Sequence, residues 1–260
     1  MDPIAELSAR AARAGLFLDF DGTLSEIVER PSDARPAAGV AAALERVAAR
    51  FALVAIVSGR SATELLEWLG PDVEIWGVHG AERTDGGRVV PSERARPYRD
   101  VMARAIADAS AALERLALPG VMVEDKGVMA TLHYRAAADP AAAERALDDL
   151  AAELADRHGL VRAGGRMAFE LRPPAEFSKR LVVLDRARAL GLAAAAFVGD
   201  DVVDLPAFDA LDELERDGAV AVRVAVDSDE APPEVLARAD VVVRGPAGVV
   251  ELLERLAGPG

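Results

Sequence analysis

An alternation of short apolar runs with helical segments occupies both ends of this chain and stops in its middle. Apolar runs at 16–21, 53–58 and 73–80 alternate with segments of helical spacing, and the same alternation continues through the last third of the chain. Strands separated by helices favour a mainly parallel sheet that is covered on both faces. We therefore predict an α/β fold in which residues 1–94 and 173–260 form a single core.

Residues 95–172 show a different order of elements. A helical segment precedes an apolar–polar alternation that turns about Gly127, and a second helix, which begins at Asp139, precedes another hairpin pattern at Gly164 and Gly165. Two helix–hairpin units in tandem indicate a small α+β module with a four-stranded sheet. Because the alternation of strands and helices resumes after residue 172, we interpret residues 95–172 as a cap domain inserted into the core.

Charge and composition exclude several classes of function. The formal net charge is −14, from 30 basic and 44 acidic residues, which disfavours nucleic acid or an anionic membrane as a partner. The chain has no cysteine, so disulfides and thiolate zinc sites are excluded. No apolar run approaches the ~18 residues of a transmembrane helix, and the first residues lack a secretory signal. We expect a monomeric, cytoplasmic enzyme that acts on a small molecule.

Polar signatures follow three of the apolar runs. Residues 19–23 read DFDGT, residues 58–60 read SGR, and residues 199–204 read GDDVVD. Each signature alone is a common turn or helix start. Parallel strands end at one sheet edge, where ligands bind, so we expect four or five carboxylates to meet there. Such crowding requires a cation, and an all-oxygen donor set suits Mg²⁺.

These motifs resemble those of the haloacid dehalogenase superfamily, whose phosphatases use an aspartate nucleophile. The matching positions are DFDGTL at 19–24, Ser58 in VSGR, Lys179, and GDDVVD at 199–204. The resemblance covers essentially the whole chain and implies a Rossmann-like parallel-sheet core, with a sheet-type cap inserted between the second and third motifs. Within the superfamily the chain is most similar to trehalose-6-phosphate phosphatases, on the further stretches VSGR at 57–60, VHGAE at 78–82, VEDKGVMATLHYR at 123–135 and FELRPPAEFSK at 169–179.

The resemblance implies a role for each motif residue. Asp19 would be the nucleophile that becomes phosphorylated, and Asp21 the general acid–base. Ser58 and Lys179 would stabilise the transferring phosphoryl group. The implied reaction is the Mg²⁺-dependent hydrolysis of trehalose 6-phosphate, the last step of trehalose biosynthesis. The expected metal ligands are Asp19, Asp21 through its backbone carbonyl, and Asp200, with Asp201 and Asp204 in support.

Strand periodicity predicts a polar face on the cap sheet. Side chains two residues apart share a face of a strand, so the polar positions of the cap strands lie opposite the apolar positions that cover the cap helices. A face that is merely solvated is the alternative. Together with the resemblance, this pattern leads us to expect substrate contacts from Arg60, His79, Glu124, Lys126, His133, Arg135 and Glu170.

Three positions depart from the family pattern. Val203 and Leu205 replace the Thr and Glu of GDDxTDE, and Arg180 follows Lys179 where glycine is usual. We expect catalysis to persist, although changed support around a metal can alter activity about 10–100-fold. The alternative functions are a phosphatase for sucrose-phosphate or mannosyl-phosphoglycerate, a phosphomannomutase-like phosphotransferase, and a non-catalytic metabolite sensor on the same fold.

Overall fold

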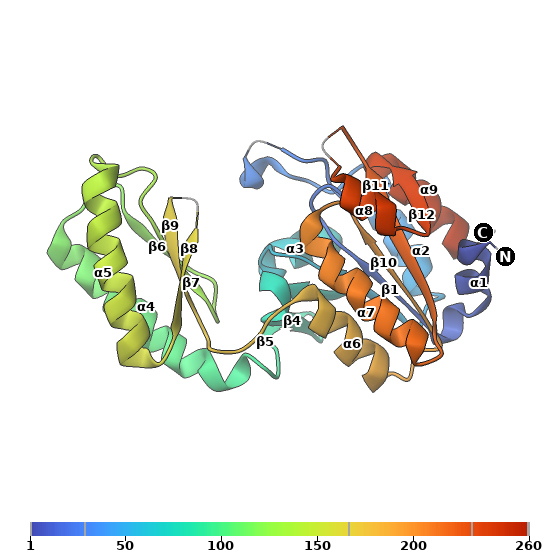
Figure 1. The fold of residues 1–260 in the computed structure, drawn as a ribbon, viewed down its shortest axis with the longest axis horizontal. Coiled ribbons are helices and arrows are strands. Elements are labelled where there is room, and N and C mark those ends of the chain that lie inside the picture. The colour runs from blue at the N-terminus through green and yellow to red at the C-terminus, as the bar shows by residue number, and fades with distance from the viewer. Residues whose placement is uncertain (1, 29, 166, 230, 259–260) are drawn as a thin grey trace. The chain divides into compact units, whose positions relative to one another are not determined.

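The computed structural model describes residues 2–28, 30–165, 167–229 and 231–258. It divides into two units, which we call the core unit (Met1–Val90 with Phe177–Gly260) and the cap unit (Pro91–Glu176) (Figure 1). The predicted boundaries, after residues 94 and 172, each lie four residues from these points. No described helix combines the length and the apolar character that a membrane span requires.

Within the described residues, the core unit contains an eight-stranded sheet in the order β12-β11-β10-β1-β2-β3-β4-β5. The strands are β1 (Ala14–Leu18), β2 (Leu53–Val57), β3 (Glu74–Gly77), β4 (Glu82–Asp85), β5 (Arg88–Pro91), β10 (Ala194–Gly199), β11 (Val220–Asp227) and β12 (Val241–Arg244). Neighbouring strands from β12 to β3 are parallel, and β4 is antiparallel to β3. The strand order reverses at β1, which has β2 on one side and β10 on the other. Ligands of open parallel sheets bind beside such a reversal, at the carboxyl ends of the strands.

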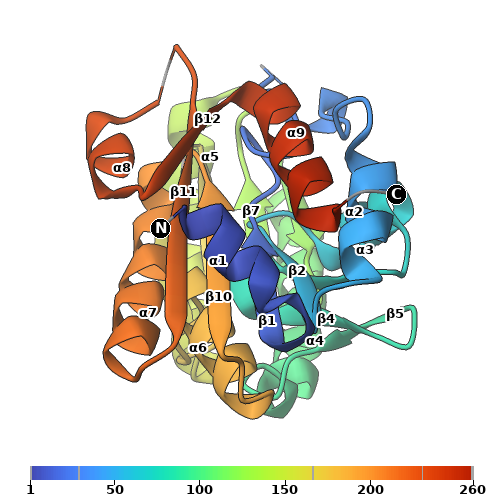
Figure 2. The same cartoon turned by 90° about the vertical axis from the view of Figure 1, so that its right-hand side faces the viewer.

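Helices cover both faces of the core sheet (Figure 2). They are α1 (Pro3–Ala9), α2 (Val40–Ala48), α3 (Ala62–Leu69), α6 (Lys179–Ala189), α7 (Leu205–Arg216), α8 (Pro233–Arg238) and α9 (Gly245–Ala257). Leu16 and Leu18 of β1 pack in one apolar cluster with residues of α1, α2, α3 and α9. Phe17 points to the other face and packs with residues of α6 and α7. Burial on both faces explains why β1 is apolar at every position and confirms the predicted fold class.

Two strand predictions were imprecise. The run at 16–21 forms a strand only as far as Leu18, so Asp19 lies just beyond the end of β1. The run at 73–80 forms β3 only over Glu74–Gly77. The β4–β5 hairpin was not predicted, although Gly86 and Gly87 both have a positive φ that suits a tight turn.

The cap unit places two helices on one face of an antiparallel sheet. Its elements are α4 (Arg99–Leu116), β6 (Met122–Asp125), β7 (Ala130–His133), α5 (Pro140–His158), β8 (Val161–Gly165) and β9 (Ala168–Arg172), with the sheet order β6-β7-β9-β8. Asp139 caps α5 as predicted, because its Oδ1 accepts the N–H of Ala142 at 3.0 Å. Met102 of α4, Leu147 of α5 and Leu132 of β7 share one apolar cluster.

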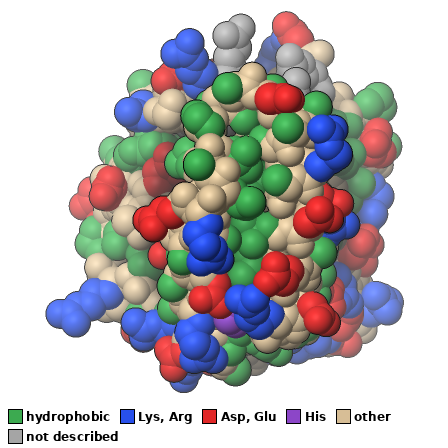
Figure 3. Space-filling model, turned by 90° about the vertical axis from the view of Figure 1, so that its left-hand side faces the viewer, with side chains coloured by type: hydrophobic (Ala, Val, Ile, Leu, Met, Phe, Trp, Pro, Cys, Tyr) green, Lys and Arg blue, Asp and Glu red, His purple; other side chains and the backbone are tan. Residues whose placement is uncertain are grey.

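A shallow groove runs between α4 and α5 on the surface of the cap unit. Ala112, Leu116, Leu150 and Leu154 contribute its apolar lining, and charged residues of both helices flank it (Figure 3).

Candidate active site

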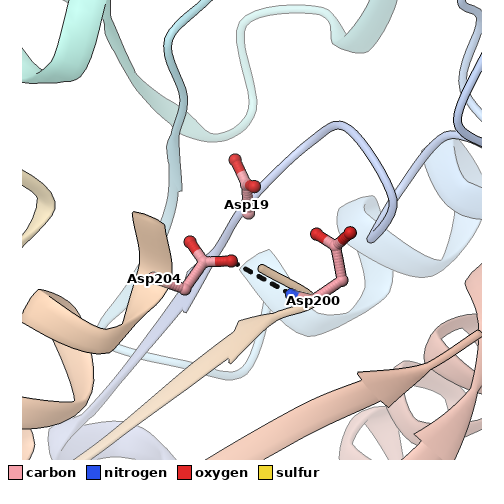
Figure 4. A group of neighbouring side chains, drawn as sticks. All are labelled: Asp19, Asp200 and Asp204. Atoms are coloured by element: carbon pink, nitrogen blue, oxygen red, sulfur yellow. Dashed lines mark hydrogen bonds between the residues drawn. The ribbon is translucent and has the colours of Figure 1, made fainter. Parts of the chain in front are cut away.

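Asp19 and Asp200 lie at the ends of neighbouring strands of the core sheet. Leu18 of β1 pairs in register with Val198 of β10, and the Asp19 N–H donates to the Val198 carbonyl at 2.9 Å. Among the described residues, Asp19, Asp200 and Asp204 offer carboxylate oxygens that all lie within 4.8 Å of one another (Figure 4). All three side chains are buried, so this edge of the sheet has a concentrated negative charge.

Lys179 supplies the positive charge of this cluster. Ser178 caps α6 by accepting the Leu181 N–H, and Lys179 is the first residue of that helix. Its Nζ lies 2.7 Å from Asp19 Oδ1 and 2.6 Å from Asp204 Oδ1, and the side chain is only 3% exposed. Burial disfavours the ammonium, but the two carboxylates outweigh this effect and raise the pKa of Lys179. The lysine therefore stays charged.

The remaining negative charge fits a hard cation. Three carboxylates and one ammonium leave two negative charges uncompensated when every group is ionised. Burial, reinforced by the neighbouring Asp204 carboxylate, raises the pKa of both Asp19 and Asp200 to about 7. Groups that resist ionisation in this way are stabilised by a divalent ion, and an all-oxygen donor set suits Mg²⁺.

Proton binding and metal binding should therefore compete at Asp19 and Asp200. Both pKa values lie above the ordinary value of 3.8, so the folded state binds more protons than the unfolded state between about pH 4 and pH 7. The free energy of unfolding of the metal-free protein should then fall as the pH rises through this window. We expect Mg²⁺ to raise the melting temperature more at pH 8 than at pH 5.5, measured by thermal unfolding with and without the ion. Equal shifts at the two pH values would contradict this prediction.

Asp204 and Asp201 have structural partners that the sequence did not reveal. Asp204 Oδ1 accepts from Lys179, and its Oδ2 accepts the backbone N–H groups of Asp200 and Asp201 at 3.0 and 3.2 Å. Asp201 caps the turn that follows by accepting the Val202 N–H at 2.6 Å. Asp204 also lies close enough to share an ion with Asp19. Asp204 thus holds the loop and Lys179, and its predicted support of a metal stays a prediction.

Gly22 permits the loop that follows β1 to approach closely the loop that follows β10. Its φ is +72°, and a Cβ at this position would lie 1.9 Å from Asp200 Oδ2. Thr23, the next residue, donates its hydroxyl to Asp200 Oδ1 at 3.4 Å. Neither residue was among the predicted site residues, although both belong to the DFDGT signature. Their contacts show that the signature shapes the site as well as supplying its carboxylates.

Gly22→Ala should therefore displace the Asp200 carboxylate and remove most of the stabilisation by Mg²⁺. Gly70→Ala is a matched control, because Gly70 also has a positive φ, of +76°, but has no neighbour within 4 Å of the added Cβ. Both variants should lose about 1–3 kcal/mol of stability from backbone strain, measured by urea unfolding. Only Gly22→Ala should lose the Mg²⁺-induced rise in melting temperature. A normal rise in that variant would show that the Asp200 position does not matter for the ion.

Ser58 follows β2, the neighbour of β1, at the same edge of the sheet. It is 1% exposed, and its Oγ accepts the N–H of Arg60 at 3.2 Å. The backbone of His79 donates to the Ser58 carbonyl at 2.9 Å, with His79 in the left-handed region at φ 57°. The His79 ring lies over Gly59, where an added Cβ would come within 2.9 Å of it. Ser58 and His79 thus belong to one packed turn.

Arg60 and Asp21 bind one another. Arg60 Nε donates to Asp21 Oδ1 at 3.0 Å and to Oδ2 at 2.8 Å, while Nη2 donates to Oδ1 at 2.8 Å. The Asp21 carboxylate lies outside the group formed by the carboxylates of Asp19, Asp200 and Asp204. In this structure Arg60 therefore forms an ion pair within the protein, and its predicted contact with the substrate stays a prediction.

The polar face of the cap sheet gathers most of the predicted substrate contacts. Glu124 pairs in register with Thr131, and Thr131 with Glu170, so these side chains share a face. Glu124 Oε2 lies 2.8 Å from His133 Nε2 and 3.4 Å from Lys126 Nζ. Burial opposes ionisation of Glu124, but these two partners outweigh it and lower the pKa of Glu124.

Glu170 and Arg135 are the two remaining predicted contacts of the cap unit. Glu170 accepts from Arg172 Nε at 2.8 Å. Arg135 lies beyond His133, where β7 ends, and is exposed. The opposite face carries Leu132 and Leu171, which pack with α4 and α5 as the alternation predicts.

The model of the trehalose-phosphatase family matches residues 17–240. The chain belongs to the trehalose-phosphatase family. The matched range includes all the predicted site residues of both units, from Asp19 to Asp204.

Individual members of the trehalose-phosphatase family and related structures are similar over nearly the whole chain. A trehalose-phosphate phosphatase of Mycobacterium avium is 37% identical over 252 residues, covering 93% of this chain and 61% of the relative. The chain thus spans less than two thirds of that relative. The structure of an Aspergillus fumigatus trehalose-6-phosphate phosphatase is 26% identical with a TM-score of 0.59, covering 98% of this chain and 97% of the other. A trehalose-6-phosphate phosphatase related protein shares the fold, with 24% identity, a TM-score of 0.68, and coverage of 94% and 96%.

The departures from the trehalose-phosphatase pattern lie at the margin of the carboxylate cluster. Arg180 binds Glu213 and so ties α6 to α7 on the surface. Leu205 begins α7 and packs against the apolar cluster beneath it, and Val203 is 50% exposed. In this family member, Lys179 contacts Asp19 and Asp204, and the three clustered carboxylates lie close together, although these three positions differ from the family pattern.

Proposed function

We propose that this chain hydrolyses trehalose 6-phosphate to trehalose and inorganic phosphate, through an aspartyl-phosphate on Asp19 and with Mg²⁺ as cofactor. One observation carries the proposal: in a member of the trehalose-phosphatase family, buried Asp19 lies 2.7 Å from Lys179 and shares a sheet edge with Asp200. This reaction would be the last step of trehalose biosynthesis. We expect it to take place in the cytoplasm.

Asp19 has the surroundings of a nucleophile. Lys179 binds its Oδ1 and fixes the carboxylate at the end of β1. Attack of an Asp19 oxygen on phosphorus would form the acyl phosphate and release the sugar oxygen, and water would then cleave the acyl phosphate. Lys179 would stabilise the charge that spreads over the phosphoryl oxygens in both steps.

Asp19, Asp200 and the backbone carbonyl of Asp21 would hold the Mg²⁺ ion. The fit rests on the uncompensated charge and the raised pKa values of this cluster. The ion, when bound, would neutralise charge on the phosphoryl group and the carboxylates.

Asp21 would protonate the departing sugar oxygen and later take a proton from the attacking water. Its side chain is 46% exposed, which leaves it accessible to a substrate. Ser58 would donate its hydroxyl to a phosphoryl oxygen, from a turn that Arg60 and His79 hold in place.

The polar face of the cap sheet would bind the sugar. Glu124, His133 and Lys126 form a connected group of donors and acceptors whose side chains are 28–43% exposed. Partly exposed charged groups that are already held by one another suit hydroxyl recognition, because little side-chain entropy remains to be lost on binding.

Phosphate release from a panel of sugar phosphates tests the proposal. With Mg²⁺ present, trehalose 6-phosphate should be turned over faster than sucrose 6-phosphate, mannose 6-phosphate and glucose 6-phosphate. Equal or faster turnover of another member would overturn the substrate assignment but not the chemistry. Accumulation of a sugar bisphosphate or an isomerised sugar phosphate, without free phosphate, would instead support a phosphotransferase.

A further inference from the structure

The Arg60 guanidinium is held by carboxylates on two sides. Three hydrogen bonds of 2.8–3.0 Å join it to Asp21, and Nη1 donates to Glu64 Oε1 at 3.1 Å. The Arg60 side chain is 9% exposed, whereas that of Asp21 is 46% exposed. The arginine is therefore the buried partner of the ion pair, and Asp21 is the exposed one.

Aromatic rings complete the surroundings of the guanidinium. Its central carbon lies 5.5 Å from the ring centroid of Phe20 and 5.3 Å from that of Trp68. The two rings stack on each other with centroids 5.3 Å apart. Trp68 and Glu64 lie four residues apart on α3 and so present the same helix face to Arg60. α3 thus contributes both an aromatic and a carboxylate contact to the guanidinium.

The backbone of Arg60 is fixed as well. Its N–H donates to Ser58 Oγ at 3.2 Å, and its carbonyl accepts the Val78 N–H at 2.8 Å. These bonds tie Arg60 to the turn that carries Ser58. Hydrogen bonds therefore connect Ser58 to Arg60 and Arg60 to Asp21.

The geometry points to Arg60 as a positioning residue for Asp21: its planar guanidinium fixes the plane and rotamer of the carboxylate that protonates the departing sugar oxygen. This inference rests on the proposed function. A guanidinium fork constrains both oxygens of a carboxylate, which a single ammonium does not. Because Arg60 is already bonded to Asp21 and Glu64, it acts through Asp21 and makes no contact with the substrate.

The leaving group distinguishes this role from a contact with phosphate. A sugar alkoxide needs a proton to depart, whereas p-nitrophenolate does not, so only the sugar phosphate depends on a correctly placed acid. Arg60→Met should lower kcat for trehalose 6-phosphate at least ~10-fold, part of the ~10²–10⁴-fold that a general acid contributes. Its kcat for p-nitrophenyl phosphate should change less than about threefold, and KM should stay within about threefold for both substrates. Arg60→Lys should recover only part of the loss.

Two further variants make the test specific. In an Asp21→Asn background, Arg60→Met should add little further loss, because the group that it positions is already gone. Arg35→Met is the matched control: Arg35 also lies 5.3 Å from the Trp68 ring, but it donates hydrogen bonds to the carbonyls of Ser32 and Ala34. Arg35→Met should keep wild-type kcat on both substrates.

Each other outcome overturns the inference. Equal losses on both substrates, a rise in KM, or additive effects of Arg60→Met and Asp21→Asn would show that Arg60 does not act by positioning Asp21. Unchanged or faster turnover would show that Asp21 needs no such support. If the wild type prefers another sugar phosphate, the proposed substrate fails, but the same comparison with that sugar phosphate still tests Arg60.

Discussion

Asp19→Asn is expected to reduce phosphate release from trehalose 6-phosphate by more than about 10⁴-fold, the scale on which loss of a covalent nucleophile acts. The amide has nearly the shape of the carboxylate but cannot form the acyl phosphate. It also removes a buried carboxylate whose pKa is raised to about 7, so the metal-free variant should be at least as stable as the wild type above that pH.

The measurement is single-turnover phosphate release together with thermal unfolding of both proteins. Asp72→Asn, at an exposed residue between α3 and β3, is the control for the same chemical change away from the site. Residual activity within about tenfold of wild type in Asp19→Asn would remove Asp19 from the chemistry.

Lys179→Met should have the largest effect on the fold. The substitution keeps an unbranched side chain but removes the ammonium that lies between Asp19 and Asp204. Loss of one partner from a buried ion pair costs about 3–5 kcal/mol, because the remaining charges are left uncompensated. Activity should fall with it, since the charge that stabilises the phosphoryl group is also gone.

The pH dependence identifies the cause of the Lys179→Met destabilisation. Without the ammonium, the pKa of the Asp19 carboxylate should rise further, so protonation at low pH relieves the repulsion from Asp204. The loss of unfolding free energy, measured in urea, should therefore be smaller at pH 5.5 than at pH 8.

Two companion variants complete this test. Adding Asp204→Asn to Lys179→Met should recover stability but not activity, and Lys126→Met, whose lysine is 28% exposed, should barely change stability. A pH-independent loss would mean that packing, and not charge, is the cause.

The positions of the carboxylates could be predicted because strand ends are visible in the sequence. Apolar runs that are buried on both faces show where β1 and β10 lie, and the acidic residues follow each run. Parallel pairing then brings Asp19 and Asp200 together, whatever the details of the side chains. The faces of the cap strands could be predicted for the same reason, since Leu132 and Thr131 must point to opposite sides.

The partners of individual charged groups could not be predicted. With 30 basic and 44 acidic residues, pattern alone does not reveal that Arg60 binds Asp21 or that Asp204 holds Lys179. These pairs join residues 39 and 25 positions apart, and only the packing of α3 and α6 decides them.

The rarity of lysine is a compositional signal that points to two of the predicted site residues. Lys126 and Lys179 are the only lysines of the sequence, and every other basic side chain apart from histidine is arginine. Lys179 lies between two carboxylates with its side chain 3% exposed, and its compact ammonium contacts both of them. A residue type that occurs at so few positions in a chain is a useful indicator of candidate site residues.

A phosphoryl group on Asp19 is the central claim, and acid quenching during turnover tests it most directly. Wild-type protein mixed with trehalose 6-phosphate and Mg²⁺, quenched within one turnover and digested, should yield a phosphorylated peptide that contains Asp19. The adduct should be absent from Asp19→Asn and should disappear as free phosphate forms. Turnover in which trehalose and phosphate appear together, with no adduct at any time, would contradict the mechanism proposed here.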